Sequence, residues 1–304
     1  MILMETAGED RQQNQKYHTM LQDAVQDILW RYDPDAGSAG DAALLAYFYL
    51  EAYARTGQPC YRRAARCTLD RLLEDGTYRE RADWTGLLIV SLVKADRILG
   101  DERFLKSAQE LKGRLSSEEA SLENCAFACW SMVELYESGF AAEDLQRAID
   151  LADKMSGMYW DVCPAAGIAL VKLARITGAE RFQVLAERQL EWTVQDAGED
   201  PVDRCIALLA VIEAAEPRWK LVCASRERIP GWLAAAVEIY RLAVLSKTAA
   251  NEDDLAEAAP WTADLPIPQV GETLYLCRKD SCMPPVGTVA ALRELFREQS
   301  GTAV

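Results

Sequence analysis

Glycines recur about forty residues apart along this chain, a period typical of helical repeats, and each closes an apolar helical run: Gly57, Gly100, Gly139 and Gly178. Polar or small residues open the same runs, namely Asp41, Asp83, Glu123 and Cys163, and a fifth unit starts near Pro201. Helix start and stop signals therefore keep one period. Such a period indicates stacked helical hairpins, in which each unit buries its apolar face only against its neighbours.

The helical runs are of two alternating kinds. Residues 42–55 are apolar on nearly every side, whereas residues 60–73 carry four arginines and an aspartate on one side. The same contrast separates 84–99 from 102–115, 125–136 from 143–158 and 164–176 from 180–193. A helix that is apolar all round is buried all round. The alternation predicts an inner and an outer ring of helices, which is a mostly α fold of the α/α toroid type.

The two ends of the chain fall outside the repeat. We expect residues 1–14 to be disordered, an amphipathic helix over 15–32, and the toroid to extend over 15–216. Short apolar runs at 219–224, 242–245 and 273–276 read as strands, with helices near 231–240 and 287–298. Three prolines make 259–271 a linker or lid. Residues 217–304 are thus predicted to form a β-containing cap that completes the toroid.

Charge and hydropathy exclude several classes of partner. There are 33 Lys and Arg against 48 Asp and Glu, a net charge of −15, which disfavours wrapping nucleic acid or lying on an anionic membrane. No apolar run is long enough for a signal h-region or a membrane span, so we expect a cytoplasmic protein. The nine cysteines contain no C-x-x-C pair, and in a reducing compartment we expect no structural disulfides and most of the cysteines to be small buried residues.

Several segments resemble one known family. They are Trp84-Thr85-Gly86-Leu87-Leu88-Ile89; Ala126-Phe127 with Glu134-Leu135-Tyr136-Glu137; Lys172-Leu173-Ala174 with Thr177-Gly178; and the ending Tyr275-Leu276-Cys277-Arg278, Cys282, Pro285-Val286. Over roughly residues 78–296 the chain is similar to the YyaL-like proteins, which are related to the spermatogenesis-associated thioredoxin-domain proteins. The resemblance implies a six-hairpin, glycosidase-like toroid shared with sugar 2-epimerases, normally preceded by a thioredoxin-like domain.

The chain departs from that family at three places. It starts almost directly in the toroid, without a thioredoxin-like domain or a C-x-x-C pair. The family's Gly-Gly-Phe and His-Phe-Glu-Lys-Met-Leu-Tyr-Asp segment is missing between Gly37 and Trp84, which suggests that one hairpin is missing. The Ser-Gly-Asn-Ser stretch reads Asp161-Val162-Cys163-Pro164 here. These departures remove polar residues that would serve a site.

Histidine and metal chemistry have little support. The single histidine, His18, lies outside the repeats, so a pair of histidine acid/base groups or a serine or cysteine triad has no histidine in the ring. Cys60 with Cys67, Cys125 with Cys129, and Cys277 with Cys282 lack the second pair that a four-ligand zinc site needs. We expect no metal and no cofactor. Cys277 and Cys282, a feature that the resemblance includes, have either a redox or a local structural role.

The best site hypothesis is the mouth of the ring at the starts of the inner helices. Glu123, Asp83, Asp161 and Cys163 are the catalytic candidates there, and Asp41, Trp84, Asn124 and Trp130 are the binding candidates. Helix capping explains the polar residues equally well, at about 0.5–2 kcal/mol each. A helix N-terminus also lowers a carboxyl pKa, the reverse of what a general acid at neutral pH needs. It would favour the Cys163 thiolate. The tryptophans are either sugar-stacking faces or core.

Three functions remain open. The first is a binding or partner protein whose glycosidase-like α/α toroid has lost catalytic parts. Its ligand would be a sugar or another small polar molecule, and its partner a separate thioredoxin-like protein. The second is a carbohydrate enzyme, epimerase- or hydrolase-like, that works with carboxylates at the ring mouth. The third is a structural helical-repeat adaptor.

Overall fold

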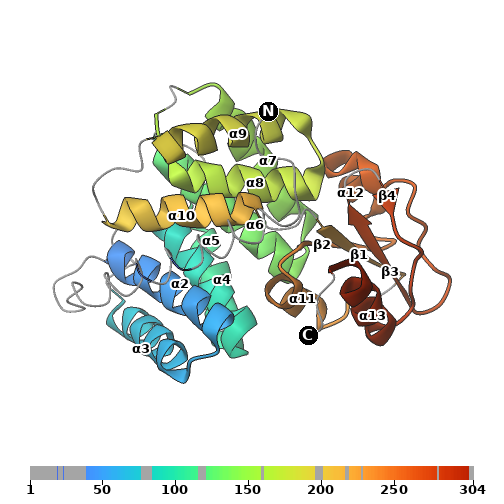
Figure 1. Cartoon of the computed structure of the whole chain (residues 1–304), viewed down its shortest axis with the longest axis horizontal. Coiled ribbons are helices and arrows are strands. Elements are labelled where there is room, and N and C mark those ends of the chain that lie inside the picture. Colours follow the sequence, from blue (N-terminus) through green and yellow to red (C-terminus); the bar gives the residue numbers. More distant parts are fainter. Residues whose placement is uncertain are drawn as a thin grey trace.

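The computed structural model describes Thr19, Asp23 and residues 39–76, 84–115, 121–158, 161–195, 201–215, 219–226, 229–278 and 281–300. Helices fill most of this length, and a small sheet follows them near the C-terminus (Figure 1). The expected mostly α fold, a toroid with a β-containing cap, is confirmed. The expectations for residues 1–14, most of the 15–32 helix, His18 and Asp83 concern positions outside the described residues.

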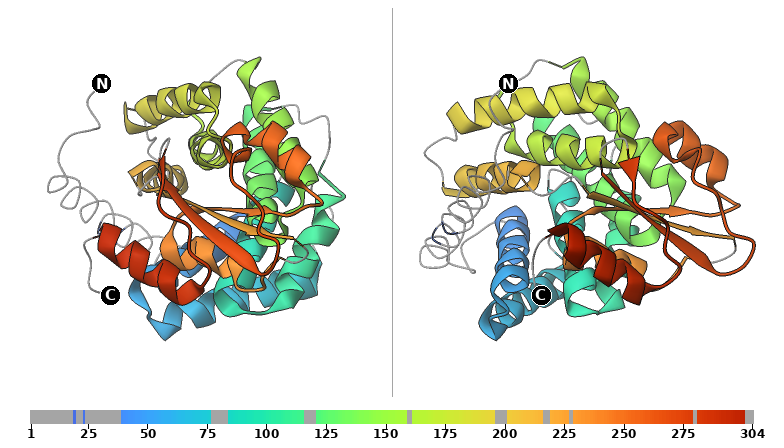
Figure 2. Two further views of the ribbon diagram at one scale, coloured as in Figure 1. Left: turned by 90° about the vertical axis from the view of Figure 1, so that its right-hand side faces the viewer. Right: turned by 45° about the vertical axis from the view of Figure 1, so that its right-hand side comes forward.

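The inner helices of the toroid are α2 (Ala39–Thr56), α4 (Thr85–Leu99), α6 (Leu122–Gly139), α8 (Pro164–Thr177) and α10 (Pro201–Ala215), and each packs against the next. The outer helices are α3 (Pro59–Asp75), α5 (Glu102–Lys112), α7 (Ala142–Ser156) and α9 (Glu180–Gln195), and each packs on the inner helix before it. The left view of Figure 2 shows these helices around a ring with the sheet in front of them. The described residues thus contain five inner and four outer helices of the ring.

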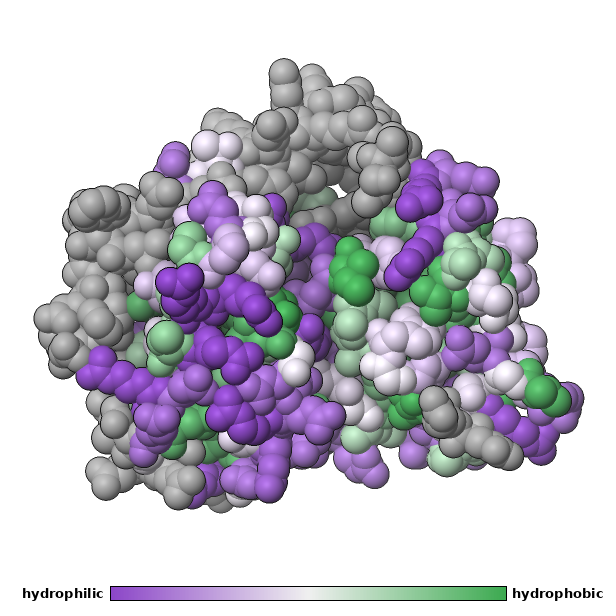
Figure 3. Space-filling view, turned by 90° about the horizontal axis from the view of Figure 1, so that it is seen from below, coloured by the Kyte–Doolittle hydropathy of each residue, from purple (hydrophilic) through white to green (hydrophobic). Residues whose placement is uncertain are grey.

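Burial follows the predicted alternation. In α6 the residues from Cys125 to Glu137 are all buried, whereas α5 buries only Phe104, Ala108 and Leu111. Helices without a polar stripe are thus enclosed by their neighbours, and helices with one face solvent. On the face of the molecule shown in Figure 3, hydrophilic residues predominate on the toroid side, and more apolar ones show on the cap side. Among the described residues, no helix is both long and apolar enough to cross a membrane.

The helix stops agree with the glycine pattern in three units and differ in one. Gly57, Gly100 and Gly178 have φ of 67°, 67° and 72°, the left-handed conformation that ends a helix. In the third unit Gly139 is the last helical residue, and Phe140 takes the left-handed position with φ 54°. That conformation costs a non-glycine residue about 1–2 kcal/mol. Burial of the Phe140 ring, edge-on to Tyr136 at 5.9 Å, offsets the cost.

The cap is a four-stranded sheet with the order β2-β1-β3-β4. Its strands are β1 (Trp219–Ser225), β2 (Ala243–Lys247), β3 (Glu272–Arg278) and β4 (Ser281–Cys282). The first two are parallel, and β3 runs antiparallel to β1 and β4. Its helices are α11 (Leu233–Tyr240) between β1 and β2, α12 (Glu252–Ala258) with the short η2 (Pro260–Thr262) before β3, and α13 (Val289–Ser300) after β4. Along the chain the cap therefore has the order β-α-β-α-β-β-α, and the sequence has no C-x-x-C pair.

The proline-containing segment after α12 is held by one buried lysine. Lys247 has no exposed surface, and its ammonium donates hydrogen bonds to the carbonyls of Thr262, Ala263 and Leu265 at 3.0, 3.2 and 2.8 Å. Trp261 in the same segment donates to the carbonyl of Ile176 at 2.9 Å. Because Ile176 lies in the last turn of α8, the segment joins the cap to the carboxyl end of an inner helix.

Candidate functional site

The predicted mouth residues lie at the starts of their helices, except for Trp130 in the middle of α6 and Asp83 outside the described residues. Ser121, which sequence reasoning passed over, caps α6, and its hydroxyl accepts the N–H of Asn124 at 3.1 Å. Glu123 lies in the first turn of α6 and Asp41 in the first turn of α2. Asp161 Oδ1 accepts the N–H of Val162 at 2.8 Å. Buried Cys163 precedes α8, and its N–H donates to Gln189 at 3.0 Å.

An aromatic column runs inward from this mouth. A side chain on Gly40 would meet the Trp84 ring at 2.2 Å, so the indole occupies the space beside the start of α2. Ring centroids then follow from Trp84 to Phe127 at 6.3 Å, from Phe127 to Trp130 at 6.5 Å, and from Trp130 to Tyr47 at 5.2 Å. Trp130 is fully buried and offers no free face to a ligand. In the described part of the chain, the centre of the ring is therefore packed with side chains.

The charged residues of the toroid gather at its opposite end, where the inner helices finish. Six residues before each left-handed stop, at the ends of α2, α4, α6 and α8, the sequence has Glu51, Lys94, Glu134 and Lys172. Three residues before the stops of α4, α6 and α8 it has Arg97, Glu137 and Arg175. Five of these seven residues are buried, and the other two have largely enclosed side chains, that of Arg97 being 0% exposed and that of Lys172 13%. Neighbouring helices thus present opposite charges at equivalent positions, which lets each charge find a partner across the helix–helix contact.

Glu134 is the centre of one half of this network. It is ion-paired with Arg97 of α4 and Lys172 of α8, and it accepts the indole N–H of Trp130 at 2.8 Å. Burial alone raises the pKa of Glu134, but Lys172 and Arg97 outweigh it and hold that pKa well below the ordinary value. Glu134 is therefore a fixed anion that joins three inner helices.

Glu51 and Lys94 form the other half with two residues from the cap. Lys94 Nζ lies 2.9 Å from Glu51 and 3.0 Å from Glu238 of α11, and Arg241 lies 2.8 Å from Glu51. Glu238 also pairs with Arg97 at 3.3 Å, which links the two halves. The cap therefore completes the charge pairing of the toroid.

Glu137 has the least complete set of partners. Its Oε1 accepts the N–H of Val244 in β2 at 3.3 Å. Its Oε2 is buried and lies 3.1 Å from Lys172 Nζ, with which it forms an ion pair. Burial raises the pKa of Glu137, Lys172 opposes that rise, and Glu134 adds to it, so the pKa lies above the ordinary value. Two carboxyl groups three residues apart thus have opposite pKa shifts.

A small polar cavity lies where these groups meet the cap. It has a volume of about 50 Å³, and its wall includes Glu51, Lys94, Glu137, Lys172 and Arg241. It can hold a few water molecules or a very small polar ligand. Within the described ranges, no group of three or more His, Cys, Asp or Glu side chains is arranged to hold a metal ion.

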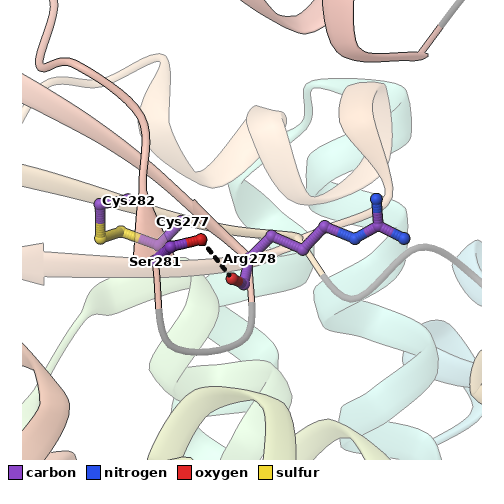
Figure 4. The surroundings of a disulfide bond; sticks show 4 residues. All are labelled: Cys277, Arg278, Ser281 and Cys282. Atoms are coloured by element: carbon purple, nitrogen blue, oxygen red, sulfur yellow. Dashed lines mark hydrogen bonds between the residues drawn. A yellow bond between two sulfur atoms is a disulfide. The ribbon is translucent and has the colours of Figure 1, made fainter.

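One cysteine pair differs from the expectation of reduced thiols. Cys277 and Cys282 form a disulfide beside the turn that joins β3 and β4 (Figure 4). They are register partners on neighbouring strands with Cα atoms 3.9 Å apart, so the hairpin itself brings their sulfurs together. Cys277 is buried and Cys282 exposed. Cys125 and Cys129 are buried and form no disulfide, and burial raises the pKa of Cys129, so this thiol is inert.

No protein-family model matches the chain, and no curated protein sequence matches it significantly. Sequence reasoning placed the site at the helix starts and missed the charges at the helix ends. The signal was present in the sequence as single charged residues at a constant distance before each helix stop, within otherwise apolar runs.

Proposed function

We propose that the protein is a glycosidase-like α/α toroid that does not cleave or epimerise sugars and instead acts as a binding or partner protein. The filled ring centre carries this proposal, because aromatic rings in contact run through it and the fully buried Trp130 has no free face for a sugar. The charged end supports it as well. A fixed anion such as Glu134, bound by two cations and an indole, makes a poor acid or base.

The ligand site in this proposal is the polar cavity under the cap. It combines donors and acceptors in a partly enclosed space, which is the setting in which polar groups recognise a small molecule. The cap takes part because the Val244 N–H holds one oxygen of Glu137. Ligand binding is thereby coupled to the contact between cap and toroid.

A turnover screen tests the proposal. The purified full chain is incubated with a panel of mono- and disaccharides, and products are followed by NMR. We expect no turnover by the wild type. A rate that disappears in Glu123→Gln, Asp83→Asn or Glu137→Gln, while Asp153→Asn on the outer surface retains it, would overturn the proposal.

One observation favours a carboxylate enzyme as the second candidate. The pKa of Glu137 is raised and that of Glu134 lowered, and divergent carboxyl pairs of this kind assign acid and base roles in hydrolases. In this case the proton donor is Glu137, at the carboxyl ends of the inner helices. Glu123 and Asp83, at the starts of the inner helices, then have no such role. A turnover rate that falls as pH rises through the pKa of Glu137, and that Glu137→Gln abolishes, would support it.

The partner half of the proposal concerns a thioredoxin-like protein. The exposed Cys282 sulfur offers an external dithiol the accessible atom of the Cys277–Cys282 disulfide. Exchange would oxidise the dithiol to its disulfide and leave two thiols on this chain. If the second thiol of the dithiol protein is replaced by serine, its remaining thiol would stay joined to Cys282 as a mixed disulfide and Cys277 would be released as a thiol, because the thiol that resolves the intermediate is absent. If a thioredoxin-like protein reduces the wild-type disulfide no faster than glutathione does, the result counts against such a partner.

A further inference from the structure

We propose that a dithiol protein docks on the open edge of β4 and pairs its main chain with that of Cys282 while it reduces the Cys277–Cys282 disulfide. This inference rests on the partner half of the proposed function, and it names the surface that such a partner recognises. It is carried by the place of β4 in the sheet, by the hydrogen bonds between β3 and β4, and by the exposure of the two cysteines.

The strand β4 is the edge of the sheet that faces away from the toroid. The sheet has the order β2-β1-β3-β4, so its two edges are β2 and β4. The β2 edge lies against the toroid, where Glu137 of α6 accepts the N–H of Val244. Both residues of β4, in contrast, are exposed. An exposed strand edge can take up a strand of another protein through its outward N–H and C=O groups.

The hydrogen bonds between β3 and β4 direct the main chain of Cys282 outward. Cys282 is the register partner of Cys277 in an antiparallel pair, and the next residue, Met283, donates its N–H to the carbonyl of Leu276 at 2.9 Å. Inward and outward groups alternate along such a strand, so the N–H and C=O of Cys282 point to the open edge. The two residues after Met283 are prolines, which have no N–H. The edge therefore offers a donor and an acceptor together at Cys282.

The same residue carries the sulfur that a thiolate can reach. Cys277 is 1% exposed, whereas Cys282 is exposed, and Figure 4 shows their disulfide beside the hairpin turn. A protein that pairs with the main chain of Cys282 thus holds its own nucleophilic cysteine near the Cys282 sulfur. Small thiols attack this sulfur without such positioning, so main-chain pairing gives a protein partner the faster reaction.

The exchange is balanced by the two thiols of the partner. Its first thiolate forms a bond with the Cys282 sulfur, the Cys277–Cys282 bond breaks, and Cys277 leaves as a thiolate that takes up a proton. The second thiol of the partner then attacks the mixed disulfide and releases the Cys282 thiol. The partner is oxidised to its disulfide, and this chain is reduced to two thiols.

Amide hydrogen exchange at Cys282, measured by NMR on the full chain with isotope-labelled cysteine, tests the docking. In Cys277→Ser, activated Cys282 is joined either to a thioredoxin whose second cysteine is serine or to 2-mercaptoethanol, which has no main chain to pair. Cys60 and Cys67, which are also exposed, are replaced by serine in both adducts. We expect the Cys282 amide to exchange at least about tenfold more slowly in the thioredoxin adduct. In the wild type, the acid-trapped adduct with the same thioredoxin should be linked at Cys282, as mass spectrometry of its peptides would show.

The outcomes separate the docking from the proposed partner. Equal exchange of the Cys282 amide in the two adducts overturns the docking, whether exchange is fast in both or slow in both. A wild-type adduct linked at Cys277 overturns it as well, because the reacting sulfur then does not belong to the docking residue. If either result accompanies reduction of the wild type that is faster with thioredoxin than with glutathione, the partner is retained and only the docking is rejected. Reduction no faster than with glutathione rejects both.

Discussion

Lys94 lies 2.9 Å from Glu51 across two neighbouring inner helices, and both residues stand six places before the glycine that ends their helix. In the next two units Glu134 and Lys172 stand six places before their left-handed stops, Phe140 and Gly178, and these two residues are also ion-paired. The repeat therefore positions charges as regularly as it positions apolar residues. A ring of alternating sign results, and it is buried where the cap covers the helix ends.

Replacing Glu134, the carboxylate at the centre of that network, should lower the stability of the fold. Glu134→Leu leaves Arg97 and Lys172 buried with one partner fewer each, and we expect a loss of about 3–5 kcal/mol in the free energy of unfolding. Urea titration measures it. Asp153→Ala, which removes the partner of Arg181 on the exposed surface, should cost less than about 1 kcal/mol. Similar small losses in both variants would mean that the buried network contributes little.

Glu137 should give the stability a specific pH dependence. Because its pKa is raised in the folded state, the folded chain binds more protons than the unfolded chain between the ordinary value of 4.5 and the raised value. Stability contributed by Glu137 therefore falls as pH rises through that window. Glu137→Gln should lack this fall, which urea unfolding of both proteins across the window would show. Parallel curves for the two proteins would contradict the raised pKa.

Glu134 should act in the opposite direction. Its pKa is lowered on folding, so its contribution to stability is complete above the ordinary value and is lost as pH falls through the folded one. Acid unfolding monitored by circular dichroism should therefore be less steep in Glu134→Gln than in the wild type. An unchanged acid transition would show that other carboxyl groups control it.

Three glycines should respond differently to alanine. A Cβ on Gly86 would lie 2.7 Å from the carbonyl carbon of Phe127, and because backbone cannot move aside easily we expect a loss of about 1–3 kcal/mol. Gly100 has open space but φ of 67°, so Gly100→Ala should cost about 1–2 kcal/mol through backbone strain alone. Gly139 has neither restriction, and Gly139→Ala should be neutral or stabilising by up to about 1 kcal/mol. Urea unfolding of the three variants gives the order, and a destabilised Gly139→Ala would contradict the helix end found here.

The disulfide should stabilise its hairpin and little else. It closes a loop with a sequence separation of 5, for which chain entropy gives about 2 kcal/mol. Hydrogen exchange on Cys282→Ser should show faster exchange in β3 and β4 and unchanged rates in α4 and α6. Faster exchange throughout the toroid would show that the disulfide supports the cap as a whole.

The sequence contained most of the fold because its helix signals repeat. Helix starts, glycine stops and the contrast between α4 and α5 are local patterns, and the strands of the cap were visible as apolar runs. Phe140 was missed because a ring contact with Tyr136 overrides the local preference for glycine at a left-handed position. The charged end was missed for a related reason. A single lysine in an apolar run, such as Lys94, reveals its role only when the neighbouring helix supplies Glu51 and the cap supplies Glu238.

The charged ring joins residues that are far apart in the sequence, and this separation affects the order in which the chain can fold. Arg241 contacts Glu51 across 190 residues of sequence, and Lys94 contacts Glu238 across 144. Contacts so distant form slowly, and during synthesis the toroid helices emerge before their last charge partners exist. We therefore expect the nascent toroid to remain loosely packed at its charged end until α11 and Arg241 have been made.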